Sequence, residues 1–202
     1  MSGLDALDPR ARDVLAFWFG GAATPAEASA RWFGRDDAFD AAIRARFAAL
    51  REEAVAGHLD AWLADAHGRL ALILLVDQFS RNLFRGDPRA FEHDPLARRW
   101  SVEGIAAGQD LELEPIERVF FYLPLEHSEA LADQRRSVTL FTALRDDAPA
   151  DRRDEFEVFL DYARRHHDVI AQHGRFPHRN AVLGRMSTAE EAAYLAQPGA
   201  GF

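Results

Sequence analysis

The sequence predicts an all-α protein with essentially no sheet. Apolar residues recur at steps of three and four over long stretches, as on the buried face of an amphipathic helix. Aspartate-proline, serine or threonine opens several of these stretches, and glycine closes them. No stretch alternates apolar and polar side chains between turn signals, as a half-buried strand would.

The amino-acid composition excludes several classes of function. The 202 residues fit a single helical domain, residues 1–202, and the formal net charge of -9 argues against nucleic-acid or anionic-membrane partners. Cysteine is absent and all 24 basic residues are arginine, which excludes disulfides, thiolate chemistry and Schiff-base lysines. The N-terminus has no signal pattern and no apolar run reaches the ~20 residues of a membrane span, so we expect a cytoplasmic protein.

The N-terminal part predicts two long helices separated by an irregular segment. Asp8, with the proline that follows it, starts the first helix, and Gly20 ends it. Residues 24–34 are expected to be irregular, with at most a turn of helix. An aspartate at 36 or 37 caps the second long helix, which Gly57 closes.

The stretch from Leu70 to Asp94 begins with a predicted buried helix that ends near Gly86 and has two faces. The apolar stripe is Leu72, Val76, Phe79 and Leu83. The polar face is Gln78, Arg81, Asn82 and Arg85, with Asp77 one turn before Arg81. So many polar groups beside a core indicate that other parts of the chain supply partners for them.

The remaining helices are expected over residues 87–91, 94–108, 114–123, 125–145 and 151–173. Pro124 should kink or break the chain between two of them, because its ring removes a helical donor. Gly174 is a C-terminal stop, residues 175–185 are non-helical, and Ser187 and Thr188 offer a capping box for the last helix. Short loops make neighbouring helices antiparallel, which fits a bundle or a solenoid of helix pairs.

Polar residues gather in three clusters. The first is the polar face of Asp77, Gln78, Arg81, Asn82 and Arg85; the second is Glu126, His127, Ser128 and Glu129; the third is Arg175, Phe176, Pro177, His178, Arg179, Asn180 and Arg185. The first cluster either faces a ligand or ties helices together by ion pairs and amides. An exposed i,i+4 pair such as Asp77 with Arg81 contributes only ~0.3–0.5 kcal/mol.

The second and third clusters also have two interpretations each. In the second, His127 between two glutamates suits a general base, or else Ser128 caps a helix whose first turn carries Glu129. The third concentrates hydrogen-bond donors that suit a phosphate or carboxylate. Its arginines otherwise pair with carboxylates such as Asp77, Glu126 or Glu129 and lock the loop in place.

No metal or cofactor is expected. The sequence has no HxxxH or HExxH pair, so a metal site would have to be assembled from His127, His166, His178 and glutamates across loops. A GxSxG elbow, a glycine-rich phosphate loop and a nucleotide fingerprint are all absent.

Four motifs carry a resemblance to a known family. They are DQFSRNLFRG at Asp77–Gly86, FEHDPLA at Phe91–Ala97, YLPLEHSE at Tyr122–Glu129 and GRFPHRNAVLGRMSTAEE at Gly174–Glu191. Together they make the chain closely similar to the bacterial family called domain of unknown function 924. The resemblance implies a tetratricopeptide-repeat-like superhelix of antiparallel helix pairs, and no activity. The family usually has arginine and phenylalanine where this chain has His167 and His173, which weakens a metal model that uses them.

These observations support three hypotheses of function. The leading one is binding of a small anionic ligand or an acidic peptide terminus in an arginine-rich concave pocket. The residues expected to bind it are Asp77, Gln78, Arg81, Asn82, Arg85, Arg175, Arg179, Asn180 and Arg185. The second is a hydrolase or lyase for an anionic small molecule, with His127 or His178 transferring protons and Glu126 or Glu129 orienting it. The third, a protein-interaction scaffold, rests on fold analogy alone.

Overall fold

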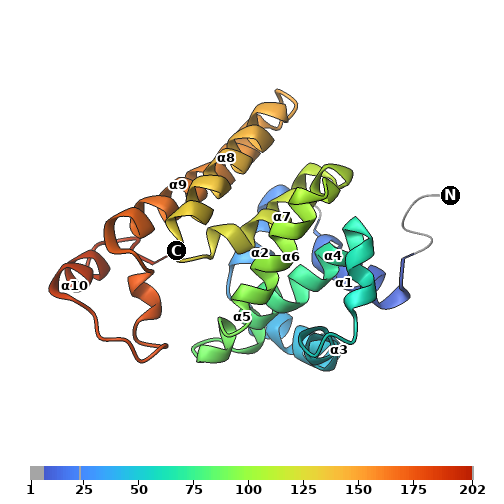
Figure 1. The fold of residues 1–202 in the computed structure, drawn as a ribbon, viewed down its shortest axis with the longest axis horizontal. Coiled ribbons are helices and arrows are strands. Elements are labelled where there is room, and N and C mark those ends of the chain that lie inside the picture. The colour runs from blue at the N-terminus through green and yellow to red at the C-terminus, as the bar shows by residue number, and fades with distance from the viewer. Residues whose placement is uncertain (1–6, 23, 202) are drawn as a thin grey trace. The chain divides into compact units, whose positions relative to one another are not determined.

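The computed structural model describes residues 7–22 and 24–201, and all regular secondary structure within those ranges is helical (Figure 1). The prediction of an all-α protein is therefore confirmed. The α-helices are α1 (Pro9–Phe19), α2 (Pro25–Phe33), α3 (Asp37–Val55), α4 (Ala66–Ile73), α5 (Phe79–Leu83), α6 (Asp94–Ala106), α7 (Pro115–Glu126), α8 (Leu131–Asp147), α9 (Arg153–His173) and α10 (Ala189–Leu195). Short 3-10 helices occupy Asp60–Ala64, Pro88–Ala90, Gln109–Glu112 and Pro177–Arg179.

The contacts of the chain define two compact units. Unit 1 contains the chain up to Arg85 together with Arg89–Phe121, and unit 2 contains the chain from Tyr122 onward together with Gly86–Pro88. The single domain of residues 1–202 and the superhelical arrangement remain predictions. Within the described ranges, the search for a helix with the length and apolar character of a membrane span finds none.

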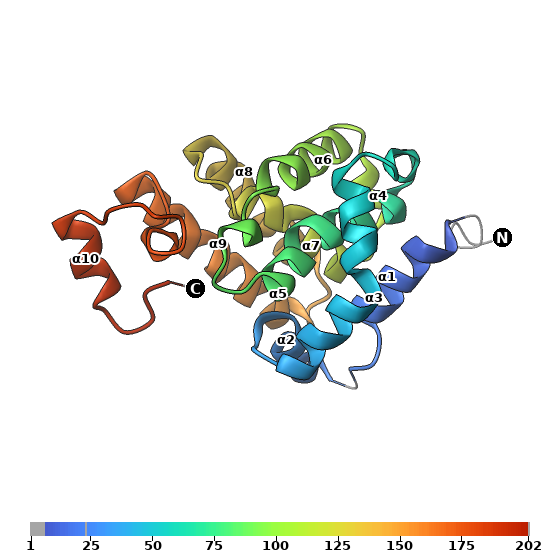
Figure 2. The same ribbon diagram turned by 90° about the horizontal axis from the view of Figure 1, so that it is seen from below.

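Unit 1 is built around aromatic side chains from four helices. In this unit α1 and α6 pack on α4, and α3 packs on α5 (Figure 2). The ring of Trp18 lies 5.4 Å from that of Phe79 and 5.5 Å from that of Phe120, and Phe47 lies 5.1 Å from Phe79. All four rings are essentially inaccessible to solvent. Each such side chain contributes about 1.5–3 kcal/mol to stability through burial.

Residues 24–34 are a correction to the sequence prediction, because they form the nine-residue helix α2. Thr24 and Glu27 make a reciprocal capping box, with Pro25 at the first helical position. Arg31 then donates hydrogen bonds to the carbonyl oxygens of Phe17 and Gly20, at the end of α1. The cap was visible in the sequence, but the contact with α1 was not.

The helix that begins the Leu70–Asp94 stretch contains one wide turn. Between α4 and α5 the residues Leu74–Gln78 adopt a π-helical turn, so the three segments make one helix from Ala66 to Leu83. Its apolar stripe is buried as predicted, and so are Asp77, Gln78 and Asn82. A π-helical turn inserts an extra residue into the helix, so side chains that follow it change direction relative to those before it.

Unit 2 consists mainly of a hairpin formed by α8 and α9, which lie side by side in Figures 1 and 2. Their buried side chains include Phe141, Leu144, Phe156 and Leu160. Gly174 ends α9 in the left-handed conformation, with φ of 70°, as its position predicted. The last helix, α10, is capped by Thr188 and Glu191 in the predicted capping box.

Two of the alternatives expected near Pro124, a break at the proline and a helix cap by Ser128, do not occur. The chain remains helical through Pro124 and α7 ends at Glu126, so no break occurs at the proline. Ser128 does not cap α8, whose N-cap residue is Ala130. Instead, the Ser128 hydroxyl donates to Asp133 Oδ2 at 2.6 Å and accepts from the backbone N–H of Ala130. These bonds shape the turn that follows the end of α7.

Candidate functional site

The first polar cluster is an ion-pair network within unit 1. Arg81 binds the Asp94 carboxylate through both terminal nitrogens, at 2.8 and 2.9 Å, and also donates to the carbonyl oxygen of Ala90. Asp77 lies 3.6 Å from Arg81, as the i,i+4 spacing predicted, and accepts a hydrogen bond from Gln78 at 2.6 Å. Burial opposes the charge on Arg81, but Asp94 and Asp77 outweigh it and raise the pKa of the guanidinium.

Asp40 of α3 organises the other half of this cluster. Its carboxylate accepts from Asn82 at 2.8 Å and from two nitrogens of Arg85. Burial acts to raise the pKa of Asp40, but the bonds from Arg85 and Asn82 prevail and lower it. Sequence reasoning missed Asp40. The available signal was its position on the same helical face as Ile43 and Phe47, where a carboxylate requires a partner.

In unit 2, Glu129 joins the second polar cluster to the third. Its two oxygens accept from Arg185 at 2.8 and 3.0 Å, and one of them also accepts from the backbone N–H of Phe176 at 2.8 Å. Burial tends to raise the pKa of Glu129, but these hydrogen bonds lower it. This is the pairing with Glu129 that the sequence offered as the alternative to ligand binding by the arginine-rich loop.

Glu191 is a second anchor of the same loop. Arg175 donates to both of its oxygens, at 2.6 and 2.8 Å, and Asn180 donates to it at 3.2 Å. Arg175, followed by the backbone N–H of Thr188, lowers the pKa of Glu191 to about 2. Arg185 completes the arrangement by donating to Asn180 Oδ1 at 2.9 Å. The capping glutamate of α10 therefore also holds the predicted ligand residues Arg175 and Asn180.

A compact set of titratable groups surrounds Phe176 in unit 2, and we call it the histidine cluster. Its members are Glu126, His127, His166, Phe176, His178 and Arg179. The ring centroid of Phe176 lies 5.5 Å from those of His166 and His178, and the Arg179 guanidinium carbon lies 4.5 Å from it.

Two further contacts close the histidine cluster. Arg179 donates to the carbonyl oxygen of His127 at 3.1 Å, and the His127 and His166 rings lie 6.4 Å apart. Nδ1 of His166 lies 3.1 Å from a carboxylate oxygen of Glu126. The cluster thus draws residues from the end of α7, from α9 and from the 3-10 helix Pro177–Arg179. His166 belongs to the histidine cluster, although the sequence suggested only a metal-ligand role for that residue.

Burial keeps two of these histidines neutral. It lowers the pKa of His166 to about 3 and, with Arg179, the pKa of His178 to about 4. Glu126 favours a charged His166, but Nδ1 lies nearer to the carbonyl oxygen of Tyr162, at 2.8 Å. Both side chains of the His166–Glu126 pair are under 10% exposed, so desolvation prevails over their attraction.

Gln134 of α8 holds the segment from which His127 projects. Its side chain is fully buried, and its amide nitrogen donates to the carbonyl oxygens of Glu126 and Ser128 at 2.6 and 2.7 Å. Carbonyl groups at the end of a helix lack intrahelical partners, so this amide satisfies groups that burial would otherwise leave unpaired. No local signal in the sequence predicts this role, because Gln134 acts on a segment that precedes its own helix.

Within the part of the chain that the structure describes, no group of three or more histidine, aspartate or glutamate side chains has the arrangement to hold a metal ion. The histidine cluster nevertheless brings together two histidines that the sequence named as candidates, His127 and His178. The first polar cluster lies in unit 1, and the second and third meet in unit 2.

Comparison with known proteins identifies the family. The model of a family described as bacterial protein of unknown function (DUF924) matches residues 14–199. The chain belongs to this family. Among solved structures, the family member is similar to a protein of unknown function from Agrobacterium tumefaciens, ATU0120. The two are 39% identical with a TM-score of 0.80, over 92% of this chain and 96% of the other. No curated protein matches the chain.

Proposed function

We propose that this protein binds a small anionic ligand at the histidine cluster, with Arg179 as the residue that contacts the anion. The observation that carries the proposal is the sign of the local potential. Burial is the main cause that lowers the pKa of His166, and the Arg179 guanidinium also lowers it, so a fixed positive charge acts on this buried ring. A positive potential inside a low-dielectric region favours an anionic group.

The burial of the cluster supports a functional role. Arg179, His166 and Glu126 are 7%, 6% and 3% exposed. Placing such groups in a protein interior costs stability, and apolar side chains of similar volume often serve the fold as well. Buried titratable groups with perturbed pKa values are concentrated at functional sites for this reason.

The pKa values favour binding over proton transfer. A general acid or base works best when its pKa is near the working pH. With a pKa of about 4, His178 is neutral near pH 7, so it suits a hydrogen bond to a ligand better than donation of a proton. This argument ranks the anion-binding hypothesis above the hydrolase or lyase that would use His178.

The proposed site is smaller than the pocket expected from the sequence. Arg81, Arg85, Arg175 and Arg185 each bind a carboxylate of their own unit, through Asp94, Asp40, Glu191 and Glu129 respectively. A guanidinium already paired in this way has less attraction for a further anion. We therefore assign these four arginines to holding the local structure. Arg179 is proposed as the ligand-binding residue because its guanidinium lies within the histidine cluster, 4.5 Å from the Phe176 ring.

Calorimetric titration with inorganic phosphate and with citrate tests the proposal. We expect Arg179→Gln to weaken binding at least about tenfold, because the variant loses one charge-assisted hydrogen bond to the anion. Arg153→Ala, which removes an exposed arginine at the start of α9, should leave binding unchanged. Absence of binding to the wild-type protein, or equal affinity of Arg179→Gln and wild type, would contradict the proposal.

A second readout does not depend on the stability of Arg179→Gln. An anion bound at the cluster offsets the positive potential, so the pKa of His166 should rise when phosphate or citrate is present. Proton NMR of the imidazole resonances measures this shift in the wild-type protein. A pKa of His166 that does not change at saturating anion would place any observed binding elsewhere.

A further inference from the structure

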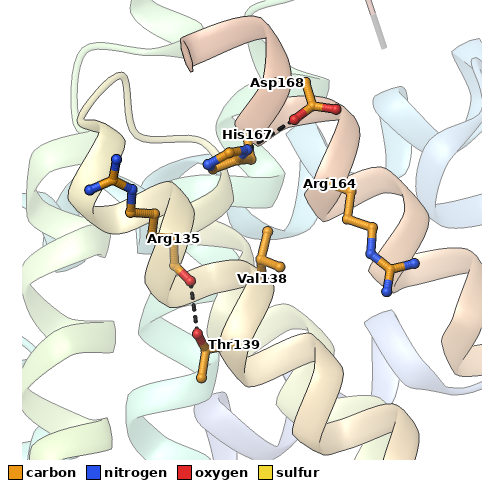
Figure 3. Close-up of a pocket in the computed structure, with 6 residues that line it drawn as sticks. All are labelled: Arg135, Val138, Thr139, Arg164, His167 and Asp168. Carbon is orange, nitrogen blue, oxygen red and sulfur yellow. Dashed lines mark hydrogen bonds and ion pairs between the residues drawn. The ribbon is translucent and has the colours of Figure 1, made fainter.

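A second polar site lies between α8 and α9 of unit 2, in a groove of about 470 Å³ (Figure 3). The groove is lined by Arg135, Val138, Thr139, Arg164, His167 and Asp168. On each helix the lining residues are spaced i, i+3, i+4, so each helix contributes one continuous face. The volume falls within the range of small-molecule sites, roughly 300–1,000 Å³.

Arg135 supplies a positive charge that no carboxylate pairs with in the described part of the chain. Its side chain is exposed, and the described part of the chain offers its guanidinium no ion-pair or hydrogen-bond partner. Opposite it, Arg164 donates to Glu157 through a single nitrogen at 3.1 Å. Glu157 is shared, because its other oxygen accepts from Arg145. The groove therefore has one unpaired and one partly paired guanidinium.

The orientation of His167 adds a third polar group. Figure 3 shows its ring lying between Arg135 and Asp168. Nδ1 of His167 is 3.0 Å from Asp168 Oδ1, so Nδ1 is engaged by the carboxylate and Nε2 is the ring nitrogen left for a ligand. Asp168 also limits the net positive charge of the groove, which favours a ligand with one anionic group over a polyanion.

The α8 wall between the cations is partly apolar. Val138 presents a hydrocarbon surface, and the Thr139 hydroxyl is turned back to donate to the carbonyl oxygen of Arg135 at 3.0 Å. This hydrogen bond uses the hydroxyl proton within α8, so the Thr139 hydroxyl does not donate to a ligand. The groove thus combines guanidinium donors with a hydrocarbon contact.

We propose that this groove binds a small organic molecule through a single carboxylate or phosphate group, with Arg135 as the anion-binding residue. The planar guanidinium binds either group by two parallel hydrogen bonds. The apolar part of the molecule packs on Val138, and the α9 wall of the groove includes Arg164. This site is separate from the histidine cluster and does not depend on the function proposed for that cluster.

NMR titration of isotope-labelled protein with benzoate and with phenyl phosphate tests the inference. The amide signals of α8 and the ring signals of His167 report the binding. We expect saturable shifts at the lining residues. Arg135→Ala should raise the dissociation constant about tenfold, as loss of a bidentate charge-assisted contact does. A preference for one probe over the other identifies the anionic group. Inorganic phosphate, which lacks the apolar part, should bind more weakly than phenyl phosphate.

Two comparisons make the result decisive. Arg153→Ala removes the same charge from an exposed position outside the groove, and should leave the dissociation constant unchanged. Arg179→Gln alters the histidine cluster and should also leave it unchanged. Shifts that do not saturate, or equal weakening in Arg135→Ala and Arg153→Ala, would overturn the inference. Weakening in Arg179→Gln but not in Arg135→Ala would overturn it as well, and would support binding at the histidine cluster.

Discussion

Replacement of Glu129 by glutamine should destabilise the protein more than a substitution at a partly exposed position usually does. Its carboxylate accepts three hydrogen bonds, two from Arg185 and one from the backbone N–H of Phe176. Hydrogen bonds to charged groups contribute about 1.5–3 kcal/mol each when well formed. The Glu129 side chain is 31% exposed, so solvent screening reduces these values.

The glutamine variant keeps one acceptor oxygen but directs an amide donor toward the donors that the carboxylate had bound. We expect the free energy of unfolding to fall by about 2–4 kcal/mol, since some contacts persist and screening limits the rest. For a chain of this size each kcal/mol corresponds to about 2–4 °C, so the melting temperature should fall by roughly 4–16 °C.

Urea unfolding followed by circular dichroism measures the change, with Glu190→Gln as the matched control. Glu190 is exposed, lies next to Glu191, and its contact with Gln172 is a long 3.4 Å hydrogen bond. The control should lie within about 0.5 kcal/mol of wild type. If Glu129→Gln were equally neutral, the Glu129–Arg185 pair would not be a structural anchor, and the assignment of Arg185 to the scaffold would be refuted.

Acidification and the substitution of a buried glycine give two further predictions about the stability of the protein. Between pH about 6.5 and 3 the unfolded chain binds a proton at His166 that the folded chain, with a pKa of about 3, does not. Because of this residue, the free energy of unfolding should therefore fall by about 1.4 kcal/mol for each unit by which the pH decreases. Urea titrations at pH 7 and pH 5 measure the change, and the His166→Gln variant serves as the comparison. Gly104→Ala should destabilise the protein by about 1–3 kcal/mol despite the better helix propensity of alanine, because the added Cβ would lie 2.5 Å from the Phe121 ring and 2.6 Å from Arg69 Cδ. An unfolding midpoint at or above that of wild type would show that the α6 contact relaxes without cost.

Much of the secondary structure was readable from local signals. Asp8 with Pro9, Thr188 with Glu191 and Gly174 are caps that act on residues within one turn, and each works as predicted. The capping box of α2 was equally local and was overlooked, because residues 24–34 show no long apolar period. The π-helical turn at Leu74–Gln78 has no comparable signal, since it depends on how the whole helix is packed.

The sequence predicted the types of residue in the candidate site, but not which of these residues pair with one another. The sequence indicated that its arginines required either a ligand or carboxylates, and it named Glu129 among the latter. It gave no means of choosing Asp40 for Arg85, 45 residues away, or Glu191 for Arg175, 16 residues away. Partners at such separations are set by helix packing, which local periodicity does not encode.

By itself the sequence determined the helical class and most helix ends, because caps, prolines and apolar periods act over a few residues. Only the tertiary structure decided which charges neutralise one another and which are gathered around Phe176. That choice depends on burial, since the same histidine or arginine is an ordinary surface group in water and a perturbed one when neighbouring helices exclude solvent from it.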